Sequence, residues 1–283
     1  MQKNANLGLQ INTEMNKKEL KKKYKIAKKN LKAEYKKARR IQKTQLREQL
    51  SLAREDFECD LSEYYLITGK KPPEDPPKRP VLEEIGNAVT HGLGALFAIA
   101  ALVLMLSVSD TVPEYVAAAV YSVGMFFMFS MSCLYHAFAH GSAVKRLFRR
   151  FDYTGIYLLI GATFAPPLLC FIGGSFGTVF SIVQWAIIIL GITLISVFGP
   201  TRLRRIHMPL YIALGWSALL LMPALIKGSF PLAMWILGGG VVYTLGIIPF
   251  MMKSNVSHFI WHFFVLGGAL VQWFGIYKYI FLA

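Results

Sequence analysis

VSHFIWHFFVLGGALVQWFGIYKYIFLA, residues 256–283, is a long apolar run in which Lys278 is the only charge. A helix of this length spans the hydrocarbon core of a bilayer. His258 and His262 interrupt it near its start, and residues four apart lie on one helical face, so both imidazoles can reach one metal ion or one water. An ionisable pair inside a membrane helix is costly and by default marks a functional site.

The charge is distributed unevenly along the chain. Of the 283 residues, 54% are hydrophobic and 17% charged. Residues 1–80 hold 21 Lys and Arg against 11 Asp and Glu, a net +10, which leaves +5 of the total +15 for the other 203 residues. This asymmetry indicates a basic cytosolic extension joined to a membrane domain. No apolar segment lies near residue 1, so we expect no cleaved signal peptide. Three widely separated cysteines predict neither a disulfide framework nor a thiolate metal site.

The basic extension, residues 1–69, is expected to be largely helical after residue 16, where Asn16 and Glu19 have capping-box spacing. Apolar residues then follow a rough period of 3.5, and dense basic runs cover the other faces. Three interpretations remain open. The helix is solvated, adsorbs to anionic lipid head groups, or forms a coiled coil, which Glu34 and Glu48 on the apolar stripe disfavour. A cytosolic protein partner is also possible, whereas no nucleic acid is expected, since only the charge would support it.

Residues 70–80, KKPPEDPPKRP, form a stiff, proline-rich linker. The transmembrane domain, residues 81–283, then contains seven apolar runs, each of about the 20 residues that cross a bilayer. We therefore predict an all-α membrane protein, a bundle of seven transmembrane helices. The expected spans are 88–108, 114–138, 153–172, 176–198, 208–226, 231–252 and 257–281.

The charges between the runs predict the orientation. Basic residues gather in alternate connections, and the intervening connections hold few of them. The positive-inside rule then puts the N-terminus in the cytosol and the C-terminus outside. The basic residues on the cytosolic side are Lys145, Arg146, Arg149, Arg150, Arg202, Arg204, Arg205 and Lys253.

This topology brings distant ionisable residues to one depth. His136 ends the second predicted helix, Asp152 opens the third, and His258 and His262 open the seventh, all at cytoplasmic ends. Three neutral histidines form a zinc site with a fourth position left for water, and zinc acidifies that water and polarises carbonyl groups. Asp152 can take the proton of the water. Ser132, one turn before His136, can orient the water or donate to a developing oxyanion.

Simpler interpretations exist for each of these residues. A single histidine at a membrane interface is usually a packing residue. Asp152 could pair with Arg149 or Arg150, and a membrane serine such as Ser132 often bonds to a backbone carbonyl of its own helix.

Two further histidines complicate the assignment. His140 lies four residues after His136, and we prefer His136 as the ligand because His140 is closer to the following loop, although spacing alone does not decide this. His207, next to an arginine cluster, is expected among the lipid head groups.

Four motifs in a fixed order carry a family resemblance. They are Glu84-x-x-Asn87-x-x-x-His91-Gly92, Ser132-x-x-x-His136, Asp152, and His258-x-x-x-His262. Over residues 80–283 the chain resembles the haemolysin III family, the bacterial branch of the progestin and adipoQ receptors, which is related to the alkaline ceramidases. The basic extension matches nothing in the core of that family.

The resemblance implies a seven-helix bundle in the bacterial inner membrane with Zn²⁺ near its cytosolic side. His136, His258 and His262 would bind the metal, Asp152 would hold the metal-bound water, and Ser132 would lie beside it. Asn87 and His91 match the first-helix motif, for which we expect support of the ligands or a structural role.

Related family members hydrolyse ceramide-type lipid amides. The leading hypothesis is therefore a zinc-dependent hydrolase of lipid amides or esters that takes membrane lipids near the cytoplasmic leaflet. The alternative is a non-enzymatic sensor or regulator of membrane homeostasis with structural zinc. A pore-forming haemolysin ranks third, because the charges sit at helix ends and no helix carries a continuous polar stripe.

Overall fold

The computed structural model describes residues 17–68, 76–252, 254 and 256–283, and these are helical apart from short connections. The chain divides into two compact units, Met1–Pro73 and Glu74–Ala283. The predicted capping box at Asn16 and most of the predicted linker 70–80 lie outside the described residues.

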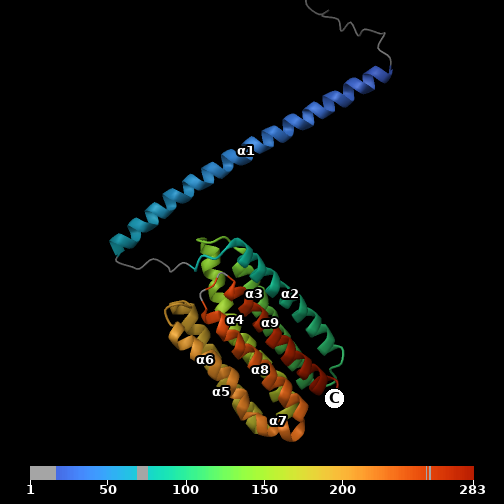
Figure 1. Cartoon of the computed structure of the whole chain (residues 1–283), viewed down its shortest axis with the longest axis vertical. Coiled ribbons are helices and arrows are strands. Elements are labelled where there is room, and N and C mark those ends of the chain that lie inside the picture. Colours follow the sequence, from blue (N-terminus) through green and yellow to red (C-terminus); the bar gives the residue numbers. More distant parts are fainter. Residues whose placement is uncertain (1–16, 69–75, 253, 255) are drawn as a thin grey trace, which may run out of the picture. The chain divides into compact units, whose positions relative to one another are not determined.

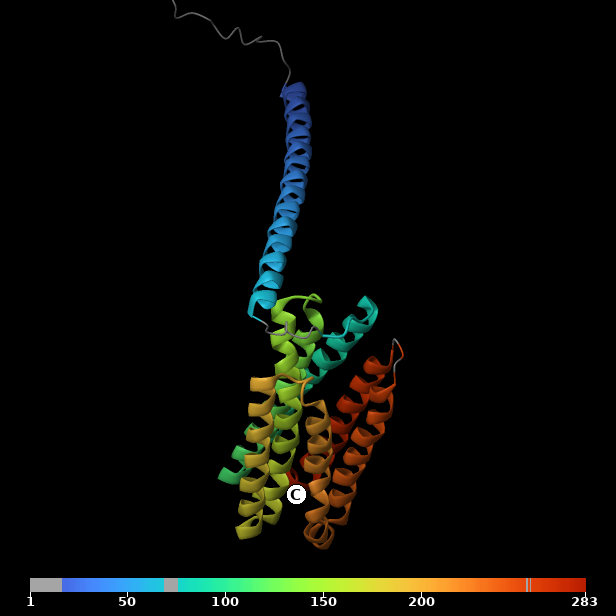
Figure 2. The same cartoon turned by 90° about the vertical axis from the view of Figure 1, so that its left-hand side faces the viewer.

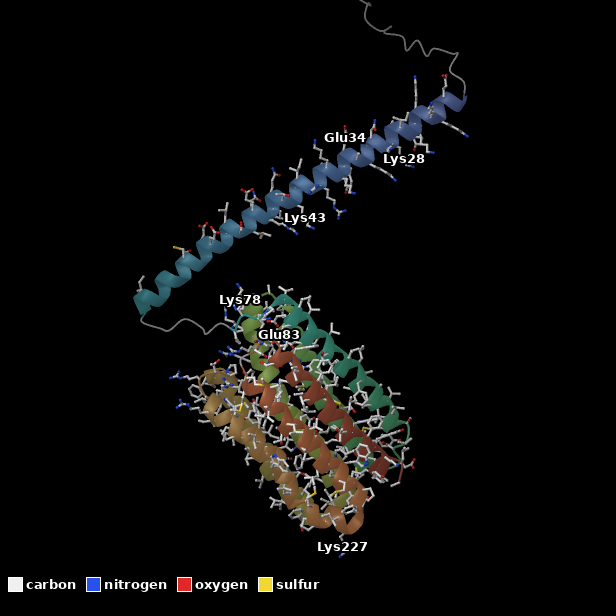
Figure 3. All side chains as sticks on the ribbon, viewed as in Figure 1. Lys28, Glu34, Lys43, Lys78, Glu83 and Lys227 are labelled. Carbon is white, nitrogen blue, oxygen red and sulfur yellow. The ribbon has the colours of Figure 1, made fainter. Side chains whose placement is uncertain are left out.

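The first unit contains one long helix, α1 (Lys17–Thr68; Figure 1). Every residue of α1 whose burial is described is exposed. Lysine and glutamate side chains project from it, as the labelled Lys28, Glu34 and Lys43 show (Figure 3). The predicted helix of the basic extension is therefore present.

The second unit is a helical bundle (Figures 1 and 2). Helix α3 packs between α2 and α4, α8 packs along α9, and α2 meets α9, so that the first and last helices of the bundle lie side by side. The helices are α2 (Val81–Leu106), α3 (Val112–Ala137), α4 (Ala143–Pro166), η1 (Pro167–Ile172), α5 (Gly174–Phe198), α6 (Arg204–Trp216), η2 (Ser217–Leu220), α7 (Met222–Gly228), α8 (Phe230–Met251), α9 (Ser257–Ile276) and η3 (Tyr277–Phe281).

Six helical segments of the described chain are long and apolar enough to cross a membrane. A seventh span results if the bent pair Arg204–Leu220 and Met222–Gly228, which meet at 42°, is counted as one. The outer faces carry exposed aliphatic side chains, such as Leu96 and Ile182, as expected for lipid contact. The orientation of the termini stays a prediction.

Two predicted span boundaries were wrong. Helix α2 begins at Val81 rather than 88, and α4 begins at Ala143 rather than 153. The apolar pattern missed the first turns of α4 because they are polar and held by specific contacts: Ser142 caps the helix, and the buried Lys145 donates from Nζ to the Phe138 carbonyl at 3.0 Å. Asp152 consequently lies well inside α4 instead of opening it.

Small residues and caps place the helices that carry the site. A Cβ on Gly155 of α4 would lie 2.9 Å from the Met128 Cα, so glycine allows α3 and α4 to approach closely. Thr111 and Glu114 form a capping box at the start of α3. Ser257 Oγ donates to the Met252 and Ser254 carbonyls, which ties the start of α9 to the end of α8.

Candidate metal centre

Three histidines from two helices meet inside the bundle. His136 lies at the end of α3, and His258 and His262 lie in the first turns of α9. One ring nitrogen from each lies within 4.8 Å of the others. The centroid of the His136 ring is 5.3 Å from that of His258 and 4.8 Å from that of His262. The convergence of these three residues, predicted from spacing and topology, is confirmed.

The nitrogen positions suit a small metal ion. The Nε2 atoms of His258 and His262 are 3.3 Å apart. Two ligands on a tetrahedral zinc with bonds of about 2.0–2.1 Å would be about 3.4 Å apart. His136 Nε2 is buried without a hydrogen-bond partner among the described residues, which is costly unless something binds there. The donor set and its geometry therefore fit a three-histidine metal site.

Helix α2 orients the histidine of α3. Glu84 Oε2 lies 2.5 Å from His136 Nδ1, and Asn87 Nδ2 lies 3.4 Å from the same nitrogen. With Nδ1 engaged, Nε2 is the nitrogen of His136 left for a metal, the arrangement in which a carboxylate fixes a ligating imidazole. Asn87 thus lies beside a candidate ligand, where the first-helix motif implied a supporting role.

His91, the third named residue of that motif, lies against His262 of α9. Its ring stacks on His262 with 3.7 Å between centroids, and Phe129 meets it edge-on at 5.1 Å. Both ring nitrogens of His91 are buried without a partner among the described residues. The stacking fixes the plane of the His262 ring, and this is the physical basis for predicting that His91 supports a ligand.

Asp152 and Ser132 lie beside the cluster. The polar side chains that face the Asp152 carboxyl include His136, Ser132, Arg79 and Arg149. Asp152 is half-buried and lines a cavity, as does the buried Ser132. Among the described residues no backbone carbonyl accepts a hydrogen bond from Ser132 Oγ, so the back-bonding alternative does not hold. Their proposed catalytic roles stay predictions.

The two arginines that could have paired with Asp152 contact other groups. Arg150 donates to the Ser196 carbonyl at 2.7 Å, and the Arg149 guanidinium lies over the Tyr153 ring. Among the described residues no ion pair within 4.0 Å joins either arginine to Asp152.

The other two histidines are outside the cluster. His140 is exposed and its Nε2 lies 2.9 Å from the Pro76 carbonyl oxygen, so the preference for His136 as ligand agrees with the structure. The prediction for His207 was wrong. It is fully buried, with Nδ1 2.9 Å from the Tyr157 hydroxyl, because a polar partner on α4 draws it into the bundle.

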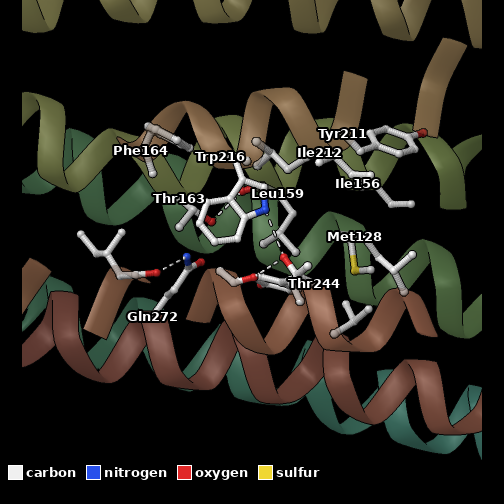
Figure 4. Close-up of a pocket in the computed structure, with 18 of the residues that line it drawn as sticks. Met128, Ile156, Leu159, Thr163, Phe164, Tyr211, Ile212, Trp216, Thr244 and Gln272 are labelled. Atoms are coloured by element: carbon white, nitrogen blue, oxygen red, sulfur yellow. Dashed lines mark hydrogen bonds between the residues drawn. The ribbon is translucent and has the colours of Figure 1, made fainter. Parts of the chain in front are cut away.

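A cavity of about 190 Å³ is lined by two histidines of the cluster and continues into the bundle. Figure 4 shows a part of its lining. His258 and His262 line one end, and Gln272, ten residues further along α9, lines it about 15 Å deeper. The walls between are mainly apolar, with Met128, Ile156 and Leu159 among them. Among the polar groups that line it, Trp216 donates to Thr244 and Gln272 donates to the Ile236 carbonyl (Figure 4), whereas the Tyr243 hydroxyl has no hydrogen-bond partner among the described residues.

Sequence reasoning missed two residues of the site as individual contributors. Glu84 was quoted within the first-helix motif without a role, and Lys145 was counted only as a cytoplasmic charge. In the structure Lys145 Nζ lies 3.0 Å from Glu84 Oε1 and is almost fully buried. The motif spacing, which puts Glu84 and Asn87 on one face of α2, was the signal that could have identified Glu84.

Comparisons with known proteins identify the family of this chain. The family model described as "Haemolysin-III related" matches residues 80–273. The chain is 36% identical over 208 residues to "Hemolysin-3" of Bacillus cereus, covering 71% of this chain and 93% of that protein. It is 30% identical over 207 residues to "Hemolysin-3 homolog" of Bacillus subtilis (strain 168), covering 70% and 95%. It is also 27% identical over 209 residues to the human "Monocyte to macrophage differentiation factor", covering 70% and 85%.

The resemblance that the four motifs indicated is thereby confirmed. The matched residues include the histidine cluster, Asp152 and all candidate spans except the end of the last one, and they leave out α1. This chain belongs to the haemolysin-III related family and is a multi-pass integral membrane protein.

Proposed function

We propose that this protein is a zinc-dependent hydrolase of lipid amides or esters. The observation that carries the proposal is the position of the histidine cluster. It lies beside Asp152 and Ser132 at one end of a long apolar cavity inside a membrane bundle. A polar site of this kind at one end of a mainly apolar cavity suits a substrate whose reacting carbonyl is attached to an acyl chain.

The residues can be given roles from their positions. His136, His258 and His262 would hold zinc, which when bound acidifies water and polarises a carbonyl oxygen. Asp152 accepts the proton of the attacking water at its carboxylate and then returns it to the departing nitrogen or oxygen. The bond between the carbonyl carbon and that atom breaks, which releases a fatty acid and an amine or alcohol. Ser132 Oγ donates to the developing oxyanion.

The cavity supports the choice of a lipid over a water-soluble substrate. Its lining is predominantly apolar and includes Met128 and Phe164. Its deep end lies at the level of Gln272, well inside the bundle. An acyl chain placed there would be removed from the surrounding lipid and would hold the carbonyl near the histidines, which supplies the positioning that a hydrolase needs.

The decisive experiment measures fatty acid release from a total membrane lipid extract by zinc-loaded protein in proteoliposomes. We expect turnover by the wild type, its loss in Asp152→Asn, and unchanged zinc content in that variant. Asp110→Asn, a change of the same kind at an exposed position in the α2–α3 connection, should retain full turnover.

Wild-type protein that binds zinc stoichiometrically but releases no fatty acid would refute the proposal. That result would favour the alternative of a regulator with structural zinc, in which His258→Ala lowers thermal stability and Asp152→Asn leaves the cellular phenotype intact. The names of the bacterial relatives refer to haemolysis. Equal lysis of erythrocytes by wild type and by a variant lacking all three histidines would favour a pore instead.

A further inference from the structure

Helix α1 is divided into two blocks of opposite charge. Residues 17–47 hold 15 Lys and Arg against 2 Glu, a net +13, and we call them the basic block. Residues 48–68 hold 1 Arg against 6 Asp and Glu, a net −5, and form the acidic block. A helix that serves only as a solvated spacer needs no such division, so the blocks indicate that one part of α1 meets a negatively charged surface.

The basic block also presents apolar side chains on one face. Tyr24, Leu31 and Tyr35 are spaced seven and four residues apart, which places them within about 40° of each other around the helix. Their exposures are 68%, 69% and 69%. Lysines border this face, and Lys28 Nζ lies 5.8 Å from the centre of the Tyr24 ring. An apolar stripe with flanking lysines is the pattern of a helix that lies in a membrane interface.

We propose that the basic block of α1 lies on the surface of an anionic lipid bilayer, with Tyr24, Leu31 and Tyr35 inserted between the head groups, and that the acidic block stays off that surface. Clustered Lys and Arg next to a membrane span are attracted by anionic lipids, whereas the carboxylates of the acidic block are repelled. The proposed contact has an electrostatic contribution from the lysines and arginines and an apolar contribution from Tyr24, Leu31 and Tyr35. Different side chains supply the two, so each can be removed by mutation without the other.

The connection to the bundle is short enough to keep α1 near the membrane that the bundle crosses. Only 12 residues, 69–80, separate α1 from α2, and 12 extended residues span at most about 43 Å. Attachment to a membrane domain makes adsorption intramolecular and raises the effective concentration of lipid at α1. The inference does not depend on the proposed hydrolase activity, because α1 lies outside the matched residues 80–273.

Nucleic acid fits these features less well. The basic block holds 12 Lys and only 3 Arg, and arginine is the residue that pairs bidentately with phosphates and bases. A duplex also offers no apolar layer for Tyr24, Leu31 and Tyr35. A second copy of the chain would need a continuous apolar seam, which Glu34 interrupts.

The test uses the full chain in nanodiscs of phosphatidylcholine alone or with added phosphatidylglycerol. A polarity-sensitive fluorophore is attached at Leu31→Cys, or at Leu52→Cys in the acidic block, in a background of Cys59→Ser, Cys133→Ala and Cys170→Ala. We expect a blue shift of the label at residue 31 with phosphatidylglycerol only, reversed by high salt because salt screens the attraction. The label at residue 52 should not shift in either lipid.

Unlabelled protein provides a second measurement. Trypsin should cleave within the basic block several-fold more slowly in the anionic nanodiscs than in the neutral ones.

Replacing Lys21, Lys25, Lys28 and Lys32 with Gln should remove the blue shift of the label at residue 31. Equal emission and equal cleavage in both lipids would overturn the proposal. Protection from trypsin in neutral nanodiscs that requires added RNA, or a higher protein concentration, would also overturn it.

Discussion

The carboxylate of Glu84 bridges His136 and Lys145: Oε2 lies 2.5 Å from His136 Nδ1, and Oε1 lies 3.0 Å from Lys145 Nζ. One side chain of α2 thereby orients a candidate metal ligand on α3 and neutralises a buried ammonium on α4. Metal binding and the stability of the bundle are consequently linked at this residue, and the two effects can be separated by mutation.

Glu84→Gln should weaken both functions. Metal affinity should fall about 10–100-fold, because His136 loses the carboxylate that orients it. The free energy of unfolding should also fall, by about 3–5 kcal/mol, because Lys145 is left as a buried, unpaired charge. Adding Lys145→Met should restore much of the stability without restoring metal affinity. Metal titration and thermal unfolding of both variants measure the two effects, and recovery of affinity in the double variant would contradict the orienting role.

His136→Ala and His140→Ala provide a matched pair, with His136 in the last turn of α3 and His140 in the connection that follows. His136→Ala should abolish stoichiometric metal binding, because only two imidazoles remain at the cluster. His140→Ala should retain it, since the His140 ring contacts the Pro76 carbonyl instead. Elemental analysis of the purified proteins distinguishes the two. Full metal content in His136→Ala would mean that the ion lies elsewhere.

Ser132→Ala should lower kcat about 10²–10³-fold, the usual loss when one donor to an oxyanion is removed. KM should change little if the hydroxyl acts mainly in the transition state. Ser130→Ala is the control, since Ser130 is also a serine of α3 without a hydrogen-bond partner among the described residues but does not line the cavity. Equal losses in the two variants would point to a packing effect.

Gly240→Leu should change chain-length selectivity without unfolding the protein. Gly240 lines the cavity, and a Cβ there would meet nothing within 4 Å, so the added side chain can extend into open space. A shorter cavity should favour lipids with shorter acyl chains. Gly238→Leu, on the same helix but outside the cavity lining, should leave selectivity unchanged. Competition between acyl chain lengths, followed by mass spectrometry, measures the ratio.

The apolar pattern of the sequence predicted the spans, apart from the starts of α2 and α4, and the helical period predicted that His258 and His262 share one face. Hydrocarbon thickness fixes span length, and the helical period fixes which residues share a face, so both can be read from local pattern. The convergence of His136 on that pair was also predictable, because the predicted topology places the end of α3 and the start of α9 at one depth.

Only the tertiary structure decided the contacts that depend on how helices pack. The polar start of α4 is stable because Lys145 forms an ion pair with Glu84 on α2. An apolar pattern in the sequence does not reveal that contact. His207 is buried because Tyr157 supplies a partner on another helix. In these cases a polar residue enters the bundle through one specific distant contact, and the energy of that contact outweighs the local preference for the membrane surface.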